Sequence, residues 1–571
     1  MAEKILSPGV FQNESDQSLV SQGVVGNTTA LVGPTAMGQP MVPTLVTSYT
    51  EYLAKFGSTF KSGSTYYEYF TSLAAKEFFN NGGQSLLVTR IISSSAYSTY
   101  ASATIPQTAA SASASFVLEA LAWGDQMNNT SSLSSGALDS GTVYNVRWEI
   151  TNVNTSSGQF SLAIRAGNDN TAQPNYLEIW PNLSLDPGQS NYISRVIGDL
   201  KPVFTTDSDG TPVVNITGSY PNISRYVRVA SINPQVDSLD NNGVFRTTFT
   251  GSLPVLGSGS YGGSFAGGVA ATNLQGLYNE NITANNIQGF PSASYITAFS
   301  LLSSKDDYKA NVLLAPGVHL ANTAATTAIN TCQNRGDMIV PLDATLYGSV
   351  VSAAATSAAN QSSNYAAAYY PWVQVYSDGL GKPVWVPPTT VVGGVYAFND
   401  TVAAEWFAPA GLNRGGIPSV VRPERKLTQA DRDNLYVNNI NPLANFPGQG
   451  VVVFGQKTLQ KKATALDRVN VRRLMIALKN YIGKVSTGLV FEQNTNVTRN
   501  RFLAQVNPYL ESVVQKQGLY AYKVVMDSTN NTADVIDRNQ LVGQIYIQPT
   551  KTAEFIILNF NLQPTGATFP A

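Results

Sequence analysis

The sequence predicts a multidomain α/β protein with a discontinuous core, a β-rich inserted domain and extended terminal arms. Its 571 residues are too many for one ordinary hydrophobic core. From Ile296 onward, short apolar runs alternate with helical patterns, which is typical of a mainly parallel sheet covered by helices. Between residues 96 and 290, short alternating runs lie among Asn, Ser, Asp and Gly clusters, which indicates β-structure.

The amino-terminal part divides into an arm and the first piece of the core. Residues 1–25 contain few apolar side chains and are expected to form an extended arm. In residues 26–98, a helix is expected over Tyr66–Asn80, because aromatic residues recur on one face and Asn81-Gly82-Gly83 supplies a carboxyl cap. Leu86–Ile92 is expected as a buried strand.

Residues 99–290 are expected to form the insertion, and residues 291–430 the main α/β domain. The alternation in that domain predicts four elements in turn: a strand at Asn311–Leu314, a helix at Thr323–Asn334, a strand at Met338–Leu342 and a helix near Ser349–Ala359. This order favours parallel strands joined by helical crossovers.

Residues 431–540 are expected to hold two long amphipathic helices. Each carries an apolar stripe at helical spacing: Val471, Leu474, Leu478 and Ile482 in the first, and Phe502, Val506, Leu510 and Val513 in the second.

The final segment, residues 541–571, holds two strand-like runs, Leu541–Gln548 and Glu554–Leu562. The second is apolar on one face throughout, at Ile556, Leu558, Phe560 and Leu562, and its other face begins apolar as well. Such a strand needs cover above and below, yet little sequence follows it. Because exposed edge strands of this kind pair with other chains, the pattern indicates assembly.

Composition narrows the function classes. Charged residues make up only 12% of the chain, about half of the usual ~25%, while Tyr (28) and Phe (23) are plentiful. This suits surfaces buried in interfaces, although a β-rich protein with long polar loops would look similar. The net charge of −1 excludes a globally basic nucleic-acid binder. The single cysteine, the lack of a long apolar run and the lack of an apolar signal region favour a protein made and kept in a cytosol.

Cationic residues gather between positions 457 and 484, where they oppose Asp467 alone: Lys457, Lys461, Lys462, Arg468, Arg472, Arg473, Lys479 and Lys484. A solvated helix face would explain such a run. A partner-facing role is the alternative, because the local field could orient an acidic surface. Aromatic residues are too sparse here to favour nucleic acid.

Nothing in the sequence assembles a catalytic, cofactor or metal site. The one histidine, His319, follows a predicted strand end, where sites in α/β folds occur, but a structural or surface role is expected. With one His and one Cys, Cys332, no usual zinc site can form. The string Gly257-x-Gly259-x-x-Gly262 matches a dinucleotide fingerprint, but no helical pattern follows and a loop is expected.

Short strings in a fixed order give the chain a recognisable pattern. They are SPGV at Ser7–Val10, FFNNGG at Phe78–Gly83, NRGD at Asn334–Asp337, APAG at Ala408–Gly411, VVVFGQKTL at Val451–Leu459, NVRRL at Asn470–Leu474, VFE at Val490–Glu492 and AEFI at Ala553–Ile556. In this order the chain resembles the tail sheath proteins of contractile-tailed bacteriophages, over about two thirds of its length. Residues 100–290 match poorly, and their counterpart in the family is an outward-facing, variable insertion.

The resemblance implies a structural role. Family members form hexameric rings stacked around an inner tail tube, between baseplate and neck, and contract to drive the tube through the host envelope. It also implies a subtilisin-like core, here without the catalytic triad. The expected partners are further copies of the chain, the tail tube protein, and baseplate and terminator proteins, with no cofactor, nucleic acid or membrane. The expected place is the virion tail, assembled in the host cytoplasm.

The resemblance also implies roles for two groups of residues. Terminal arms donate strands to neighbouring subunits, which points to Pro8, Gly9, Val10, Phe11, Ile556, Leu558, Phe560 and Leu562. A basic helix lies against the tube, which points to Lys461, Lys462, Arg468, Arg472, Arg473 and Lys479.

Three alternatives stay open at this point. The chain could be the sheath of a phage-like particle, such as a tailocin or a secretion apparatus. It could be an α/β hydrolase-like enzyme that uses His319, or an adhesin that binds host cells through residues 100–290.

Overall fold

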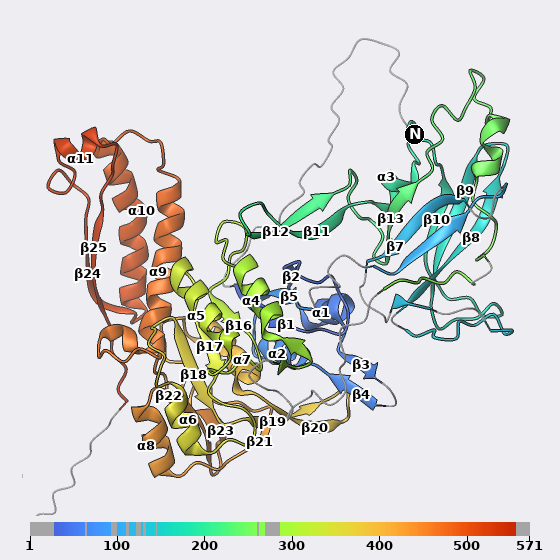
Figure 1. Ribbon diagram of the computed structural model, residues 1–571. Helices are drawn as coiled ribbons and strands as arrows, with labels where there is room; N and C mark the ends of the chain where they lie inside the picture. Colours follow the sequence, from blue (N-terminus) through green and yellow to red (C-terminus); the bar gives the residue numbers. More distant parts are fainter. Residues whose placement is uncertain are drawn as a thin grey trace, which may run out of the picture.

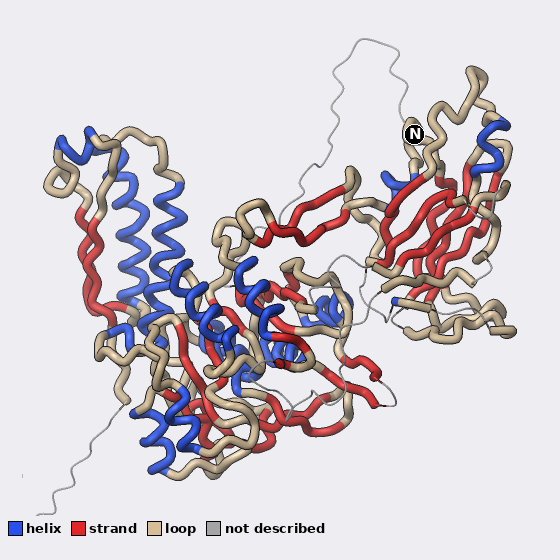
Figure 2. Tube along the Cα trace, viewed as in Figure 1, coloured by secondary structure: helices blue, strands red, loops and turns tan. Residues whose placement is uncertain are grey.

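The computed structural model combines helices and strands in several units (Figures 1 and 2). It describes residues 28–62, 65–92, 100–109, 113–121, 127–129, 133–143, 145–259, 262–268 and 286–554. Their buried apolar side chains form three separate clusters: one in the central α/β part, one in the insertion and one in the carboxyl-terminal part.

A mixed sheet forms the centre of the molecule. Two four-stranded halves, β16-β1-β5-β2 and β17-β18-β22-β23, meet along β16 and β17. The amide of Leu313 donates to Ile339 (2.9 Å) and the amide of Ile339 donates to Asn311 (3.0 Å), so the halves are continuous. The strands are β1 (Thr28–Gly33), β2 (Thr44–Val46), β5 (Ser85–Arg90), β16 (Val312–Leu314), β17 (Val340–Asp343), β18 (Ala366–Tyr370), β22 (Ile440–Phe446) and β23 (Gly450–Val453).

The inner strands of this sheet run parallel, and the outer strands β2 and β23 run antiparallel. The sequence prediction of a mainly parallel sheet is therefore confirmed. Helices α2 (Phe70–Asn80) and α7 (Pro388–Val402) pack on each other over one face, and α4 (Ser292–Leu301), α5 (Thr323–Arg335), α6 (Val351–Ser357) and α8 (Gln429–Val437) cover the other (Figure 1). Cover on both faces explains why every residue of β1 and β5 is buried.

One helix begins later than the sequence predicts. The helix expected over Tyr66–Asn80 begins at Phe70, and Thr65–Glu68 instead forms β4, which pairs with β3 (Thr59–Ser62). Tyrosine is a good strand former, and the hairpin gives these residues backbone partners that a helix would have replaced. A further helix, α1 (Tyr49–Phe56), lies before this hairpin.

The insertion stands between β5 and β16 in the chain. It contains two antiparallel sheets with the strand orders β13-β7-β6 and β10-β9-β8. Phe116 from the first sheet stacks on Phe160 from the second, with ring centroids 5.5 Å apart. The strands are β6 (Ser102–Pro106), β7 (Ala114–Ala120), β8 (Val146–Asn154), β9 (Gln159–Ala166), β10 (Tyr176–Leu183) and β13 (Val227–Ile232). A hairpin of β11 (Lys201–Thr206) and β12 (Pro212–Thr217) reaches back, and its Phe204 packs on the central core (Figure 1).

The carboxyl-terminal part pairs α9 (Val469–Thr487) with α10 (Asn496–Gln515). A two-stranded ribbon of β24 (Leu519–Val525) and β25 (Gln544–Pro549) lies along them, with α11 (Ala533–Asp537) at the turn (Figure 1). Both predicted helices are confirmed, and the α10 stripe of Phe502, Val506, Leu510 and Val513 is buried. Ile545 and Ile547 of the ribbon face this core, whereas Tyr520 and Tyr546 are exposed.

Asp343 joins strand β17 to the loop after β16 and to helix α7. It ends β17, and its carboxyl group accepts hydrogen bonds from the amides of Gly317 and Thr389 (both 2.9 Å) and from the Thr389 hydroxyl (2.8 Å). Thr389 lies in the first turn of α7. Complete burial raises the pKa of Asp343 to about 7, although the three hydrogen bonds act in the opposite direction.

This raised pKa predicts a pH-dependent stability. Between the ordinary value of 3.8 and about 7, folded Asp343 holds a proton that the unfolded chain releases, so the free energy of unfolding falls as pH rises through this range. The effect is at most on the order of 4 kcal/mol. In Asp343→Asn, urea unfolding between pH 4.5 and 8 will show a shallower decline than in the unsubstituted chain. Parallel pH profiles for the two proteins would contradict this prediction.

Candidate functional site

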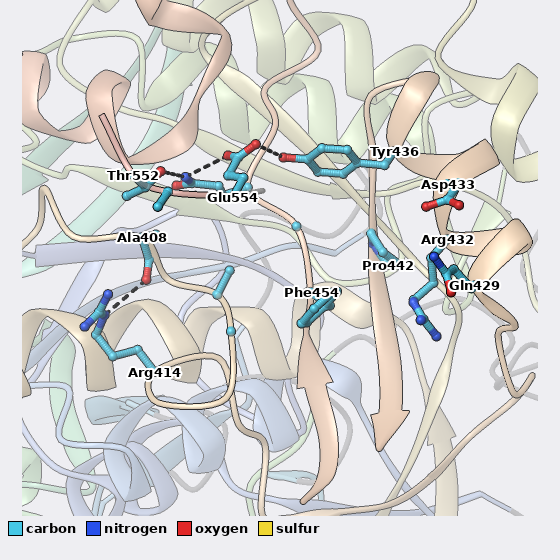
Figure 3. A pocket seen from close by; sticks show the side chains of 15 residues that line it. Ala408, Arg414, Gln429, Arg432, Asp433, Tyr436, Pro442, Phe454, Thr552 and Glu554 are labelled. Atoms are coloured by element: carbon cyan, nitrogen blue, oxygen red, sulfur yellow. Dashed lines mark hydrogen bonds between the residues drawn. The ribbon is translucent and has the colours of Figure 1, made fainter. Parts of the chain in front are cut away.

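The last described residues return from the ribbon to the edge of the central sheet. Thr552, Ala553 and Glu554 pass beside β22, β23 and α8 (Figure 3). The side chain of Glu554 turns inward and fixes residues 552–554 to the body of the protein.

Four hydrogen bonds hold the Glu554 carboxylate. Arg468 donates from Nε to Oε1 (2.7 Å) and from Nη2 to Oε2 (3.0 Å). The Tyr436 hydroxyl donates to Oε2 (2.7 Å), and Gln456 Nε2 donates to Oε1 (3.1 Å). Gln456 Nε2 also reaches the Thr552 hydroxyl. We call Glu554, Arg468, Tyr436 and Gln456 the anchor.

The anchor residues come from elements that the local sequence places. Arg468 is the residue before α9, and the first amide of that helix, from Val469, donates to the Gln456 carbonyl at 2.8 Å. Gln456 follows the end of β23, and Tyr436 lies in the last turn of α8. The anchor therefore joins the sheet, both neighbouring helices and the carboxyl-terminal segment.

The electrostatics of the anchor favour a charged pair. Burial would raise the pKa of Glu554, but the hydrogen bonds from Arg468 and Tyr436 outweigh it and hold this pKa below its usual range. Burial and the Glu554 carboxylate together raise the pKa of Tyr436, so its hydroxyl stays a donor. The bidentate contact with a guanidinium is among the strongest hydrogen-bonding arrangements in proteins.

A cavity of about 500 Å³ opens beside the anchor (Figure 3). Its lining includes Ala410, Arg414, Arg432, Pro442 and Phe454, together with residues 552–554. The Arg432 guanidinium lies 5.3 Å from the ring centroid of Phe446 and 5.9 Å from that of Phe454. The cavity thus combines an aromatic wall with cationic groups.

The structure divides the predicted basic cluster. Arg472 and Arg473 are only 3% and 2% exposed, so the expectation that they belong to an exposed basic face is wrong. Arg473 donates to Asp400 of α7 at 2.6 Å and lies over the Tyr396 ring, while Arg472 lies over the Tyr365 ring. The Asp400 carboxylate outweighs the burial of Arg473 and raises its pKa, whereas burial lowers the pKa of Arg472 in spite of the Tyr365 contact. Both contacts attach α9 to the central α/β part.

The other members of the cluster have different surroundings. Arg468 belongs to the anchor, whereas Lys461, Lys462 and Lys479 are exposed. A tube-facing role for these lysines stays a prediction. The predicted arm residues Pro8, Gly9, Val10, Phe11, Ile556, Leu558, Phe560 and Leu562 lie outside the described residues.

The candidate catalytic groups are inaccessible. His319 is 3% exposed and Cys332 is fully buried, and burial raises the pKa of the Cys332 thiol. Neither lines the cavity beside the anchor. Within the described ranges, no cluster of three or more acidic, His or Cys side chains could hold a metal ion, and none of the helices is long and apolar enough to cross a bilayer.

Sequence reasoning missed the anchor. The available signals were an acid, Glu554, at the start of an apolar run and an arginine directly before a helix. Neither residue type reveals its partner without the fold, because 86 positions separate Arg468 from Glu554.

Comparisons with known proteins agree on one family. The phage tail sheath protein central domain matches residues 281–459, and the phage tail sheath C-terminal domain matches residues 461–563. The tail sheath protein of Vibrio phage KVP40 is 40% identical over 210 residues, which cover 37% of this chain and 31% of that protein. The tail sheath protein of Enterobacteria phage T4 is 43% identical over 185 residues, covering 32% and 28%. The matched stretches thus span less than a third of either relative.

A solved structure extends the likeness in fold to most of the chain. The sheath tail protein Lin1278 from Listeria innocua superposes with a TM-score of 0.52, at 10% identity, over 92% of this chain and 95% of that one. With two sheath domains matched in succession and relatives of the same kind, the chain belongs to the phage tail sheath family.

Proposed function

We propose that the chain is the structural subunit of a contractile phage tail sheath. It polymerises as stacked hexameric rings around an inner tail tube and contracts to drive the tube through the host envelope. The observation that carries this proposal is the succession of two sheath domains across residues 281–563, which include the second half of the sheet, the anchor and the ribbon.

The ribbon and the anchor suit a strand-exchanging lattice. Among the described strands, β24 and β25 pair only with each other, so each has an open edge that can accept an added strand. The anchor holds residue 554 firmly to the body of the protein. We infer that residues 555–571 and the amino-terminal arm add strands to the ribbons of neighbouring copies.

Contraction uses two packings of one subunit lattice and needs no fuel molecule. The buried positions of His319 and Cys332 favour a structural over a hydrolytic role. The partners are further copies, the tail tube, the baseplate and the tail terminator, in a virion tail assembled in the host cytoplasm. The core is subtilisin-like, and residues 99–290 face outward.

The arm proposal predicts the effect of a truncation. Removing residues 555–571 leaves β25 and the anchor in place, so the chain will stay folded but will no longer form tubes, because the donated strand is gone. Circular dichroism checks the fold and negative-stain microscopy checks the tubes. Tubes of normal length from this truncation would contradict strand donation.

The anchor predicts a loss of lattice stability in Glu554→Gln. An amide keeps the size of the side chain but loses the ionic bidentate contact, which weakens the anchor by about 1–3 kcal/mol. Tubes will disassemble at a lower temperature, measured by light scattering, while Asp534→Asn in the exposed Arg538 pair will have no effect. Because the pKa of Glu554 is lowered, unsubstituted tubes will keep this contribution above pH 4.5 and lose it only in more acidic solution. Equal melting of both variants would refute the role of the anchor.

The exposed lysines predict a tube-specific defect. Replacing Lys461, Lys462 and Lys479 with Glu will impair co-assembly with the tail tube more than self-polymerisation, since these side chains are exposed. Arg473→Glu serves as a contrast, because it places a buried carboxylate beside Asp400 and will lower the thermal stability of the whole chain. An equal loss of both kinds of assembly in the lysine variant would rule out tube contact.

A further inference from the structure

The loop between α9 and α10 presents a phenylalanine entirely to solvent. Phe491 is 100% exposed, Val490 before it is 59% exposed, and Val497 in the first turn of α10 is 78% exposed. We call these three residues the apolar tip. Phe491 also has a φ of 71°, in the left-handed region that bulky residues rarely adopt and that costs about 1–2 kcal/mol. No burial of the ring within the chain offsets this strain.

Hydrogen bonds hold the apolar tip in this conformation. The amide of Glu492 donates to the Leu489 carbonyl at 3.1 Å and closes a turn around Phe491. Asn494 Nδ2 donates to the Gln540 carbonyl, and Arg499 Nε donates to Asn494 Oδ1, both at 2.8 Å. The ring is therefore displayed by an ordered loop. An exposed aromatic group held in this way is typical of a residue that buries its ring in an interface with a partner.

The cavity beside the anchor has properties that complement the apolar tip. It offers an aromatic wall in Phe454, which is 44% exposed, and a volume of about 500 Å³, ample for one aromatic side chain. Its guanidinium groups, from Arg414 and Arg432, form no ion pair with any described carboxylate within 4.0 Å, although Asp433 also lines the cavity. Glu492, directly after Phe491, has the exposed Arg501 as a distant partner at 4.0 Å, a contact that a second copy can replace. Shape, apolar character and charge therefore match.

The apolar tip and the cavity lie at opposite ends of α9. Arg468, at the cavity end, directly precedes this 19-residue helix, and Phe491 lies four positions beyond its last residue, Thr487. A helix of that length spans roughly 28 Å, so the two cannot meet within one chain. A contact between them must join two copies head to tail. Unless the rotation closes a ring, such a contact generates a helical polymer.

We propose that the apolar tip of one copy inserts Phe491 into the cavity beside the anchor of a neighbouring copy. Phe491 stacks on Phe454, and Glu492 pairs with Arg414 or Arg432. This inference rests on the proposed function, because it requires the chain to polymerise, and it adds a second, side-chain-mediated contact to the strand exchange.

Cysteine cross-linking in assembled tubes tests the inference. A chain carrying Phe491→Cys and Ala410→Cys will give a ladder of covalent multimers when oxidised, because Ala410 lines the cavity. Each single variant alone will give none, and a mixture of the two will give dimers only. The native Cys332 is fully buried and will stay silent. Charge reversal gives a second readout: Glu492→Arg and Arg432→Glu will each shorten the tubes, and the two together will restore their length.

The outcomes separate this inference from the proposed function. Tubes of the double-cysteine chain that give no ladder overturn the inference and leave the sheath proposal standing, whereas an unsubstituted chain that never polymerises overturns both. A chain with Ala410→Cys and Phe560→Cys tests the other occupant. An intramolecular cross-link there, seen as a monomer of altered mobility, would show that the chain's own terminal segment fills the cavity and would also overturn the inference. Phe491→Ser will also shorten the tubes, whereas Val421→Ser, at another exposed apolar position that does not line the cavity, is the matched control and will leave them unchanged.

Discussion

The paired hydrogen bonds between Arg468 and Glu554 fix residues 552–554 to the start of α9 and to the neighbouring edge of the central sheet. A carboxylate that is half-buried must have donors, and here a guanidinium, a phenol and an amide supply them from three separate segments. Removal of Arg468 would leave the Glu554 carboxylate without a cationic partner, whereas removal of Glu554 would leave Arg468 with Asp467 alone, at 3.1 Å.

Two buried arginines attach helix α9 to the central part of the protein at a second place. Arg473 ties α9 to α7 through Asp400, and Arg472 packs on Tyr365 just before β18. The α9–α10 pair, with its ribbon, is thus held against the central part by charge-assisted and cation–π contacts as well as by apolar packing. Since these contacts are directional, they fix the orientation of the ribbon, which a purely apolar interface would specify less tightly.

Periodicity in the sequence was sufficient to find the regular elements. Helices α5, α9 and α10 and the parallel strands follow from the spacing of apolar residues, because that spacing directly reflects which face is buried. Which of the cationic residues are buried and which are exposed could not be predicted from periodicity. Arg473 and Lys479 stand on the same helix with similar polarity, and only the positions of Asp400 and Tyr396, about 75 residues away, decide that the arginine is buried. The start of α2 differs from the predicted one for a related reason: Tyr66 fits a helical stripe, but pairing with β3 determines its conformation.

The position of the insertion has a consequence for how the core tolerates change. The chain leaves the sheet after β5, where the amide of Ile91 donates to Gly33 at the end of β1, and returns where Gln288 contacts the Pro316 carbonyl just after β16. The insertion therefore leaves and rejoins the core at the same end of the parallel strands. Closing a longer excursion between two such points costs only about 0.6 kcal/mol for each doubling of length. The core can accordingly carry excursions of very different length, which makes this end of the sheet a natural place to graft a foreign domain.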